Sequence, residues 1–379
     1  MSYEALALGA NAFEIGLLAS SFAAIAALAA IPLGRVIDAV GSRPVMAGGA
    51  ILCGAACGLI GLADSIPMLA AAQAVLGLGQ LMAVVGSHTT LATRGGRQAR
   101  AGRVGFYTSA ASLGIAVGPI LAGLLVGEAF DADRARVGYG AAVLLAAGAL
   151  GAIALMPSSG SPSPASTDPQ RGRPLSVLGT LRRPGMLAAL SAGVTALVAN
   201  DLLAAYLPVY GEAAGISPQQ IGITLGTLAI AQIASRLVLG RVLARFAPSA
   251  VLMTSLVVAG VGVPLLLLTA QAVWLLAIVA VIGAGLGLAQ PLTLVWVVHT
   301  MPSYSQGLAM GIRMTGNRLG QLAIPVTVGG TAGQFGTDVI MLTIASLLVG
   351  ATAFVGLRRR SLDADGAEDA EMGAASLDA

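Results

Sequence analysis

Long apolar runs, separated by short polar segments, follow one another through most of the chain. A helix needs about 20 apolar residues to cross the hydrocarbon core of a bilayer. Eleven runs reach roughly this length, at residues 13–33, 45–63, 68–88, 104–126, 137–156, 187–210, 219–239, 249–269, 272–296, 307–330 and 338–357. Only helices and closed barrels satisfy their backbone hydrogen bonds in lipid, and these runs are too long for barrel strands. The pattern predicts an all-α polytopic membrane protein with eleven spans.

The composition supports this prediction and adds an orientation. Of 379 residues, 56% are hydrophobic and 10% are charged, whereas soluble domains carry roughly 25% charged residues. When the segment after the first span is placed in the cytoplasm, fifteen of the 20 basic residues, all of them arginines, lie on the cytoplasmic side. Only Arg134 and Arg136 lie on the opposite side. Because cytoplasmic loops carry the excess of positive charge, Met1 is expected outside and the C-terminus inside the cell.

Two polar segments divide the chain. A Pro/Ser-rich stretch begins the predicted cytoplasmic linker 157–186, and six acidic residues without a base predict a disordered tail at 361–379. The segments leave an N-terminal half of five spans, 1–156, and a C-terminal half of six spans, 187–360.

The two halves repeat each other at an offset of 206 residues. Glycines and a proline recur in register, which a chance alignment of apolar runs would rarely produce. The pairs include Gly16/Gly222, Gly34/Gly240, Gly77/Gly283, Gly79/Gly285, Gly114/Gly320, Pro119/Pro325 and Gly123/Gly329. Transporters commonly contain such repeats, with the substrate site between them. The offset maps Met1 onto Leu207, so we expect the chain to begin in an extracytoplasmic loop, with the partner of the span 187–210 absent.

The polar turn after the first span has a recognisable pattern. The segment from Gly34 to Arg43 reads GRVIDAVGSR, and it resembles the cytoplasmic loop signature of the Major Facilitator Superfamily. The residues that carry the resemblance are Gly34, Asp38, Gly41 and Arg43. We expect a tight turn at Gly34 and Gly41, and the resemblance implies that Asp38 braces a cytoplasmic gate. Ala39 and Ser42 depart from the signature, which leaves a solvated turn with one ion pair as the alternative.

A second motif, from Gly114 to Gly123, reads GIAVGPILAG and resembles the antiporter signature of the same family. Its four key residues are Gly114, Gly118, Pro119 and Gly123. Gly114 and Gly118 are four residues apart, so they are expected to form a flat ridge for close helix contact, and Pro119 is expected to bend the helix. The resemblance associates this contact with exporters, whereas ordinary helix packing is the alternative.

The resemblance covers the whole chain and implies an architecture. It indicates a fold of two pseudo-symmetric six-helix halves that lacks its first helix, similar to the 12-helix drug or metabolite:proton antiporters. It also implies alternating access, a monomer without a cofactor, and a bacterial inner-membrane location. The implied partners are the lipid bilayer, a small-molecule substrate and protons, but no nucleic acid.

Polar groups inside spans are costly and therefore mark candidate pathway residues. The candidates are Gln73, Asn200, Asp201, Arg313, Asn317, Arg318 and Gln321. Asp201 is either a protonatable coupling site or an ion-pair partner that fixes packing. Arg313, Asn317 and Gln321 recur every four residues, so they share one helix face. Gln73 stands where the family's third motif has an arginine, which weakens the prediction of proton coupling through that position.

These observations predict a secondary transporter, with proton-coupled efflux of a small amphipathic compound or metabolite as the leading activity. Import of an organic anion is the alternative, because arginines outnumber the single intramembrane aspartate. A membrane sensor that binds without transport is a further alternative. An intramembrane enzyme is disfavoured because the chain has two histidines and two cysteines, with no spacing typical of a metal or nucleophilic site.

Overall fold

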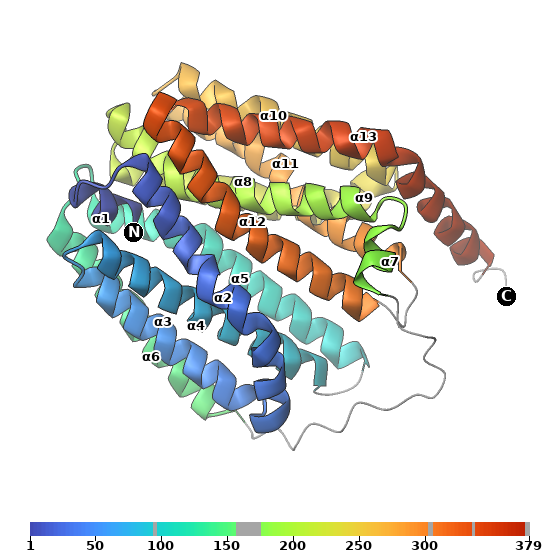
Figure 1. The fold of residues 1–379 in the computed structure, drawn as a ribbon, viewed down its shortest axis with the longest axis horizontal. Helices are drawn as coiled ribbons and strands as arrows, with labels where there is room; N and C mark the ends of the chain where they lie inside the picture. Colours follow the sequence, from blue (N-terminus) through green and yellow to red (C-terminus); the bar gives the residue numbers. More distant parts are fainter. Residues whose placement is uncertain (94–96, 157–175, 302–305, 336–337, 376–379) are drawn as a thin grey trace. The chain divides into compact units, whose positions relative to one another are not determined.

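The computed structural model describes residues 1–93, 97–156, 176–301, 306–335 and 338–375, and these residues form a chain of helices (Figure 1). In order, the helices are α1 (Ser2–Ala7), α2 (Ala12–Val40), α3 (Ser42–Gly61), α4 (Ile66–Thr93), α5 (Arg97–Val126), α6 (Ala132–Ala154), α7 (Val177–Leu181), α8 (Met186–Ala213), α9 (Pro218–Leu243), α10 (Pro248–Leu265), the 3₁₀ helix η1 (Leu266–Leu268), α11 (Ala272–His299), α12 (Gln306–Phe335) and α13 (Asp338–Ala375).

Each of the eleven predicted spans coincides with a long helix. Within the described part of the chain, ten helices are long and apolar enough to cross a membrane. The eleventh, α12, is 30 residues long but more polar than the others, because it carries Arg313, Asn317 and Arg318. The prediction of an all-α polytopic membrane protein is confirmed.

The repeat found in the sequence is also present in the positions of the helices. Four helices of the first half begin 206 residues before their counterparts in the second half. The starting residues are Ala12 and Pro218 for α2 and α9, Ser42 and Pro248 for α3 and α10, Ile66 and Ala272 for α4 and α11, and Ala132 and Asp338 for α6 and α13. The six residues of α1 correspond to the last six residues of α8.

The turns that precede α2 and α9 are built from the same hydrogen bonds. Gly9 ends α1 with a φ of 80°, a left-handed conformation that favours glycine. The Ala10 N–H donates to the Ala5 carbonyl at 2.8 Å, and the Gly9 N–H donates to the Leu6 carbonyl at 2.9 Å. The second copy has Gly215 with a φ of 69°, and bonds from Ile216 to Gly211 at 2.7 Å and from Gly215 to Glu212 at 3.2 Å.

Glycines bring the repeated helices into backbone contact. A Cβ atom at Gly77 of α4 would overlap the carbonyl group of Phe22 in α2, and one at Gly283 of α11 would overlap that of Leu228 in α9. These two contacts are again 206 residues apart. A side chain at Gly79 would lie 2.9 Å from the Cys53 nitrogen in α3. Small residues permit this close approach, on which helix association in lipid depends.

The chain forms two compact units. Unit 1 comprises residues 1–168, 205–226 and 321–337, and unit 2 comprises residues 169–204, 227–320 and 338–379. Three helices, α8, α9 and α12, therefore contribute one part to each unit. Because the units follow packing rather than chain order, their limits differ from the halves 1–156 and 187–360, whose boundaries stay a prediction.

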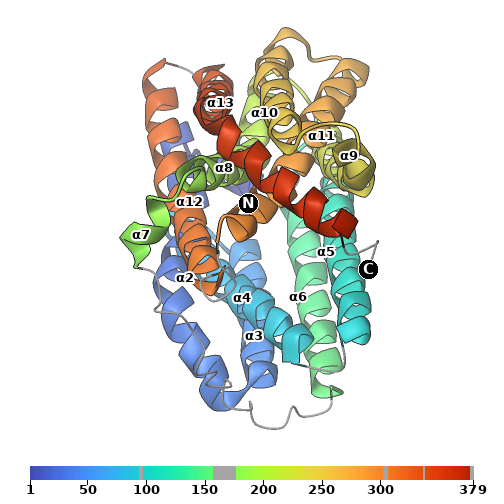
Figure 2. The ribbon, with the colours of Figure 1, turned by 90° about the vertical axis from the view of Figure 1, so that its right-hand side faces the viewer.

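The acidic segment after α13's apolar part continues as a helix to Ala375 (Figures 1 and 2). The composition predicts a disordered tail at 361–379, so the structure differs over most of that segment. Alanine, leucine and glutamate are good helix formers, and a helix that has already nucleated extends at low cost. Residues 376–379 and residues 157–175 of the predicted linker lie outside the described part.

We expect Gly77→Ala to destabilise the protein by roughly 1–3 kcal/mol, the usual cost of inserting atoms into a packed contact. The reason is that the new methyl group cannot fit unless α2 and α4 separate. Gly148→Ala in α6 is the matched control, since nothing lies within 4 Å of its Cβ position. Thermal unfolding of the detergent-purified protein measures both effects. Equal unfolding temperatures for the two variants would contradict the backbone contact.

Candidate functional site

A group of polar side chains lies within the apolar helices of unit 2. Asn200 and Asp201 come from α8, Gln232 from α9, Gln290 and Thr293 from α11, and Arg313, Asn317 and Arg318 from α12. We call these eight residues the polar cluster. Since lipid offers no hydrogen-bond partners, such groups are stable only when they bind one another, water or a ligand.

One pair of the polar cluster is an amide–amide contact between α8 and α9. The Gln232 Nε2 donates to Asn200 Oδ1 at 2.6 Å. Gln232 is buried, and the bond satisfies one donor of an amide that carries no charge. The contact joins two helices of unit 2 without bringing a charge into the membrane.

Arg313 is held by a second amide. Its Nη2 donates to Gln290 Oε1 at 2.9 Å, and Gln290 Nε2 donates in turn to the carbonyl of Gly193 in α8 at 3.0 Å. Only 8% of Arg313 is exposed, and its buried Nε has no hydrogen-bond partner. Gln290 therefore orients the guanidinium group, but a neutral amide cannot neutralise its charge.

Asp201 and Arg318 bring opposite charges to the polar cluster. The two side chains are close enough for their charges to interact. Asn317 lies next to Arg318 on α12, and its buried Oδ1 has no hydrogen-bond partner. The arrangement thus combines an aspartate and an arginine whose charges interact with two buried polar atoms, Arg313 Nε and Asn317 Oδ1, that no described group satisfies.

Two residues predicted for the same pathway lie elsewhere. Gln73 belongs to unit 1, where it is 7% exposed and its Oε1 has no described partner. Gln321 shares the helix face of Arg313 and Asn317, but it falls in the part of α12 that belongs to unit 1. The sequence interpretation missed Gln232 and Gln290. Each is an uncharged polar residue inside an apolar run, and such a residue indicates a functional site less strongly than a charged residue does.

The turn between α2 and α3 is shorter than predicted. Gly34 lies inside α2, which continues to Val40, so only Gly41, with a φ of 85°, lies in the turn. An α-helix tolerates an internal glycine, and this explains why Gly34 does not end α2. The side chain of Asp38 lies outside the described part, so its bracing role stays a prediction.

Arg43 connects this turn to α6. Its Nε donates to the Ile153 carbonyl at 3.1 Å, and its Nη2 donates to the Ala154 carbonyl. Both carbonyls belong to the last turn of α6, where backbone acceptors lack the usual i+4 partner, although that of Ile153 also accepts from the Met156 N–H. A cation there also interacts favourably with the helix dipole. Arg43 therefore caps α6 within unit 1.

In the second motif, the close contact with another helix lies on the side of α5 opposite to the predicted glycine ridge. A Cβ atom at Gly114 or Gly118 would meet no described atom within 4 Å, so the structure gives no close contact there within unit 1 and the ridge stays a prediction. At 3.6 residues per turn, Gly123 faces the opposite side. A Cβ atom at Gly123 would lie 2.9 Å from the Gly222 Cα in α9, and one at Gly222 would press on the Pro119 carbonyl. Pro119 and Gly123, but not Gly114 and Gly118, make the helix crossing.

A second crossing in unit 1 repeats the first and adds a side chain. Gly16 of α2 faces Pro325 of α12, and these two residues are the repeat counterparts of Gly222 and Pro119 in the α5–α9 contact. Here the hydroxyl group of the buried Tyr206 lies 3.1 Å from the Ala12 carbonyl oxygen and 3.2 Å from that of Pro325. In the α5–α9 crossing, the atoms nearest to the Cβ positions of the two glycines are all backbone. Tyr206 thus adds a side-chain hydrogen bond to the α2–α12 crossing that the equivalent α5–α9 crossing lacks at these positions.

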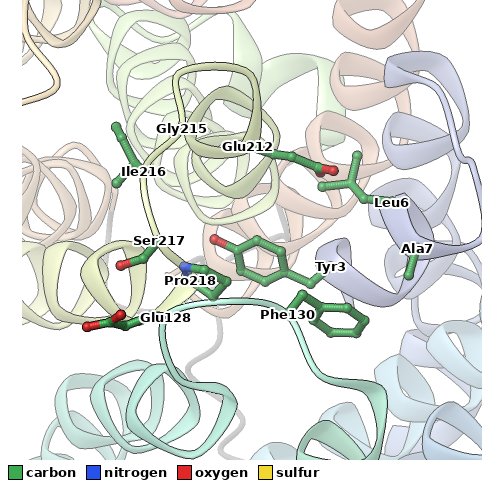
Figure 3. Close-up of a pocket in the computed structure, with 10 residues that line it drawn as sticks. All are labelled: Tyr3, Leu6, Ala7, Glu128, Phe130, Glu212, Gly215, Ile216, Ser217 and Pro218. Carbon is green, nitrogen blue, oxygen red and sulfur yellow. The ribbon is translucent and has the colours of Figure 1, made fainter.

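A cavity of about 310 Å³ lies in unit 1 at the turn before α9 (Figure 3). The ring of Tyr3 stacks on Phe130 with centroids 6.0 Å apart, and Glu128 and Glu212 also line the cavity. Burial, and to a smaller degree the charge of Glu212, raises the pKa of Tyr3. Both glutamates are exposed, and the cavity belongs to a different unit from the polar cluster. We therefore take the polar cluster as the candidate site.

Comparisons with known proteins agree with the architecture. The sequence model of the Major Facilitator Superfamily matches the chain twice, at residues 1–217 and 197–377. No curated protein matches the sequence. The structure resembles the crystal structure of a D-xylose–proton symporter, with a TM-score of 0.74, 14% identity, and coverage of 91% of this chain and 87% of the symporter. It also resembles a mutant of the nucleoside transporter NupG, with a TM-score of 0.71, 15% identity, and coverage of 94% and 93%.

We expect Gly123→Leu to lower the unfolding temperature and to impair transport, because a leucine cannot fit against the backbone of α9. Gly118→Leu adds the same side chain to the same helix on a side where nothing lies within 4 Å. It should leave the unfolding temperature close to that of the parent protein. Similar losses of stability in both variants would contradict the observed face of α5.

Tyr206→Phe should destabilise the protein by about 1 kcal/mol, the usual net value of one hydrogen bond. The cost is modest because the Ala12 and Pro325 carbonyls keep their positions in helices. Tyr107→Phe is the control, since the edge contact of its ring with His88 survives the change. Chemical unfolding in detergent measures both, and an unchanged stability of Tyr206→Phe would show that the hydroxyl does not pin the crossing.

Proposed function

The chain belongs to the Major Facilitator Superfamily, and from this premise we propose that it is a secondary active transporter that exports a small amphipathic compound in exchange for protons. Members of the family are transporters, which fits a chain of long apolar helices with two related halves. Catalysis of a chemical step has no part in this proposal.

The observation that supports proton coupling is the electrostatic interaction between Asp201 and Arg318 inside unit 2. A carboxylate within a membrane helix is costly unless a cation or a proton neutralises it. Protonation of Asp201 would release Arg318, whereas loss of the proton would restore the pair. A two-state element of this kind can tie the movement of helices to the proton concentration on the accessible side.

The α5–α9 crossing favours export. The resemblance associates the motif from Gly114 to Gly123 with exporters, and two of its four key residues, Pro119 and Gly123, form a close helix contact. Import of an organic anion is the second candidate, and it is favoured by the buried Arg313. The symporter and the nucleoside transporter are only 14% and 15% identical to the chain, so their likeness supports the fold and not a substrate or a direction of transport.

We further propose an orientation and a location. The excess of arginine on one side places the C-terminus in the cytoplasm and Met1 outside. In this orientation the turn between α2 and α3 is cytoplasmic, and Asp38 there braces the gate. The proposal places the protein, as a monomer, in a bacterial inner membrane.

Asp201→Asn should abolish proton-driven transport but spare exchange of substrate between equal proton concentrations, because the amide cannot carry a proton across. A growth-sensitivity screen of a deletion strain first identifies a compound. Proteoliposomes with imposed pH gradients of each sign then measure its transport, and the sign that drives accumulation distinguishes export from import.

Asp64→Asn is the matched control, since Asp64 is exposed in the turn between α3 and α4. It should transport normally. Uphill transport by Asp201→Asn at the parent rate would refute coupling through Asp201, and loss of folding in that variant would support a role in packing alone.

A further inference from the structure

The cavity of about 310 Å³ at the turn before α9 is separate from the polar cluster, and all of its lining residues belong to unit 1 (Figure 3). Small-molecule pockets have volumes of about 300–1,000 Å³. Three parts of the chain form its wall, namely α1, the α5–α6 turn, and the α8–α9 turn with its flanking residues. The cavity is therefore large enough for a small organic molecule.

The charged side chains of the cavity are both acidic. Glu128 comes from the α5–α6 turn and Glu212 from the last turn of α8, and the lining contains no basic residue. Neither carboxylate forms an ion pair with another described residue. Because two like charges at one cavity repel each other, a bound cation lowers the energy of both. The charge of the cavity thus favours a cation over an anion.

The backbone donors beside the cavity are already used. The Gln219 N–H donates to the Gly127 carbonyl at 3.0 Å, and the Gln220 N–H donates to Ser217 Oγ at 3.3 Å. Pro218, the first residue of α9, has no N–H. A helix N-terminus binds an anion through free N–H groups. Since these three positions offer none, the start of α9 does not turn the cavity into an anion site.

An aromatic pair and apolar side chains form another part of the wall. The rings of Tyr3 and Phe130 stack with centroids 6.0 Å apart and planes 18° apart, and Leu6 and Ile216 add apolar surface. Aromatic faces attract organic ammonium groups that lie within about 6 Å of the ring centroid. No group of three or more histidine, cysteine, aspartate or glutamate side chains among the described residues could hold a metal ion. The lining therefore suits an organic ammonium group better than a metal ion.

The hydroxyl group of Tyr3 is the unsatisfied polar group of the cavity. Its oxygen is buried and has no hydrogen-bond partner among the described residues. The hydroxyl points toward Pro218, which has no N–H to donate (Figure 3). The charge of Glu212 also acts on this hydroxyl. A ligand with an N–H or O–H group near its cationic centre can satisfy the oxygen while it neutralises the carboxylate.

We propose that this cavity binds a small organic ammonium compound, whose cationic group lies against the rings of Tyr3 and Phe130 and is neutralised by the carboxylates of Glu128 and Glu212. The bound cation links the α5–α6 turn to the end of α8. The site does not depend on the proposed function, because none of its residues belongs to the polar cluster. In the proposed orientation of the chain, it lies on the extracytoplasmic side.

The test measures binding by the detergent-purified full chain in the absence of any gradient. Choline is compared with its uncharged carbon isostere, benzylammonium with benzyl alcohol, and both cations with sodium chloride at equal ionic strength. We expect at least one cation to raise the unfolding temperature while its neutral counterpart and sodium chloride do not. The proposal is overturned when neither cation acts, or when a control acts as strongly as the cation.

Charge variants assign the response to the cavity. Glu128→Gln and Glu212→Gln keep the shape of the side chain, and each should weaken binding about two- to fivefold, the usual value of an exposed charge pair. The double variant should not respond. Asp64→Asn is the matched control, since Asp64 is an exposed carboxylate of unit 1 outside the cavity lining, and it should bind like the parent protein. Undiminished binding in the double variant, or an equal loss in Asp64→Asn, would overturn the assignment.

Variants of Tyr3 test the aromatic wall. Tyr3→Leu should weaken binding about two- to fivefold, the usual value of an exposed cation–π contact. Tyr3→Phe keeps the ring and should bind more tightly than Tyr3→Leu, and unfolding temperatures without ligand verify that both variants fold. Equal binding by Tyr3→Leu and the parent protein would remove the aromatic contact from the site.

A last variant separates this site from the proposed transport mechanism. Asp201→Asn changes only the polar cluster of unit 2, so it should bind the ammonium compound as tightly as the parent protein even where proton-driven transport is lost. Loss of binding in Asp201→Asn would overturn the independent location of the site. Normal binding in Asp201→Asn, together with loss in the double glutamate variant, would support it whatever the coupling ion of transport is.

Discussion

Lipid cannot hydrogen-bond to the chain, and most features of the structure follow from this one constraint. It forces the spans to be helices, and it makes every polar side chain within them depend on an internal partner. The bonds from Gln232 to Asn200 and from Gln290 to Arg313 and Gly193 meet this demand. It is not met at Arg313 Nε and Asn317 Oδ1, two buried atoms of the polar cluster without a hydrogen-bond partner among the described residues.

The same constraint makes close backbone contact important, since apolar side chains gain little by leaving lipid for each other. Glycines supply that contact at equivalent positions of both halves, at Gly77 against Phe22 and at Gly283 against Leu228. The requirement is steric and depends on the absence of a Cβ atom. For this reason it recurs in the two halves although most of their other residues differ.

The helices and the repeat could be predicted from the sequence because they depend on quantities that one segment carries by itself. These quantities are the length of an apolar run and the spacing of glycines. The face that α5 presents to α9 could not be predicted in this way. The spacing of Gly114 and Gly118 equals that of a packing ridge, but only the position of the partner helix decides that Gly123 is used. Likewise, Gln290 gains its importance from Arg313 on another helix, and no local pattern joins them.

The repeat also shows at which equivalent positions the two halves differ in polar and charged residues. Positions 313, 317 and 318 of α12 correspond to Tyr107, Ala111 and Ser112 of α5, which carry no charge. Position 290 of α11 corresponds to Val84 of α4. The equivalent helices thus share glycine contacts, while the one charged residue that is buried among the described residues, Arg313, lies in the second copy. Packing and polar chemistry are therefore separable here: glycine contacts support both copies, and the charged residues of the polar cluster, Asp201, Arg313 and Arg318, lie in α8 and α12 of unit 2.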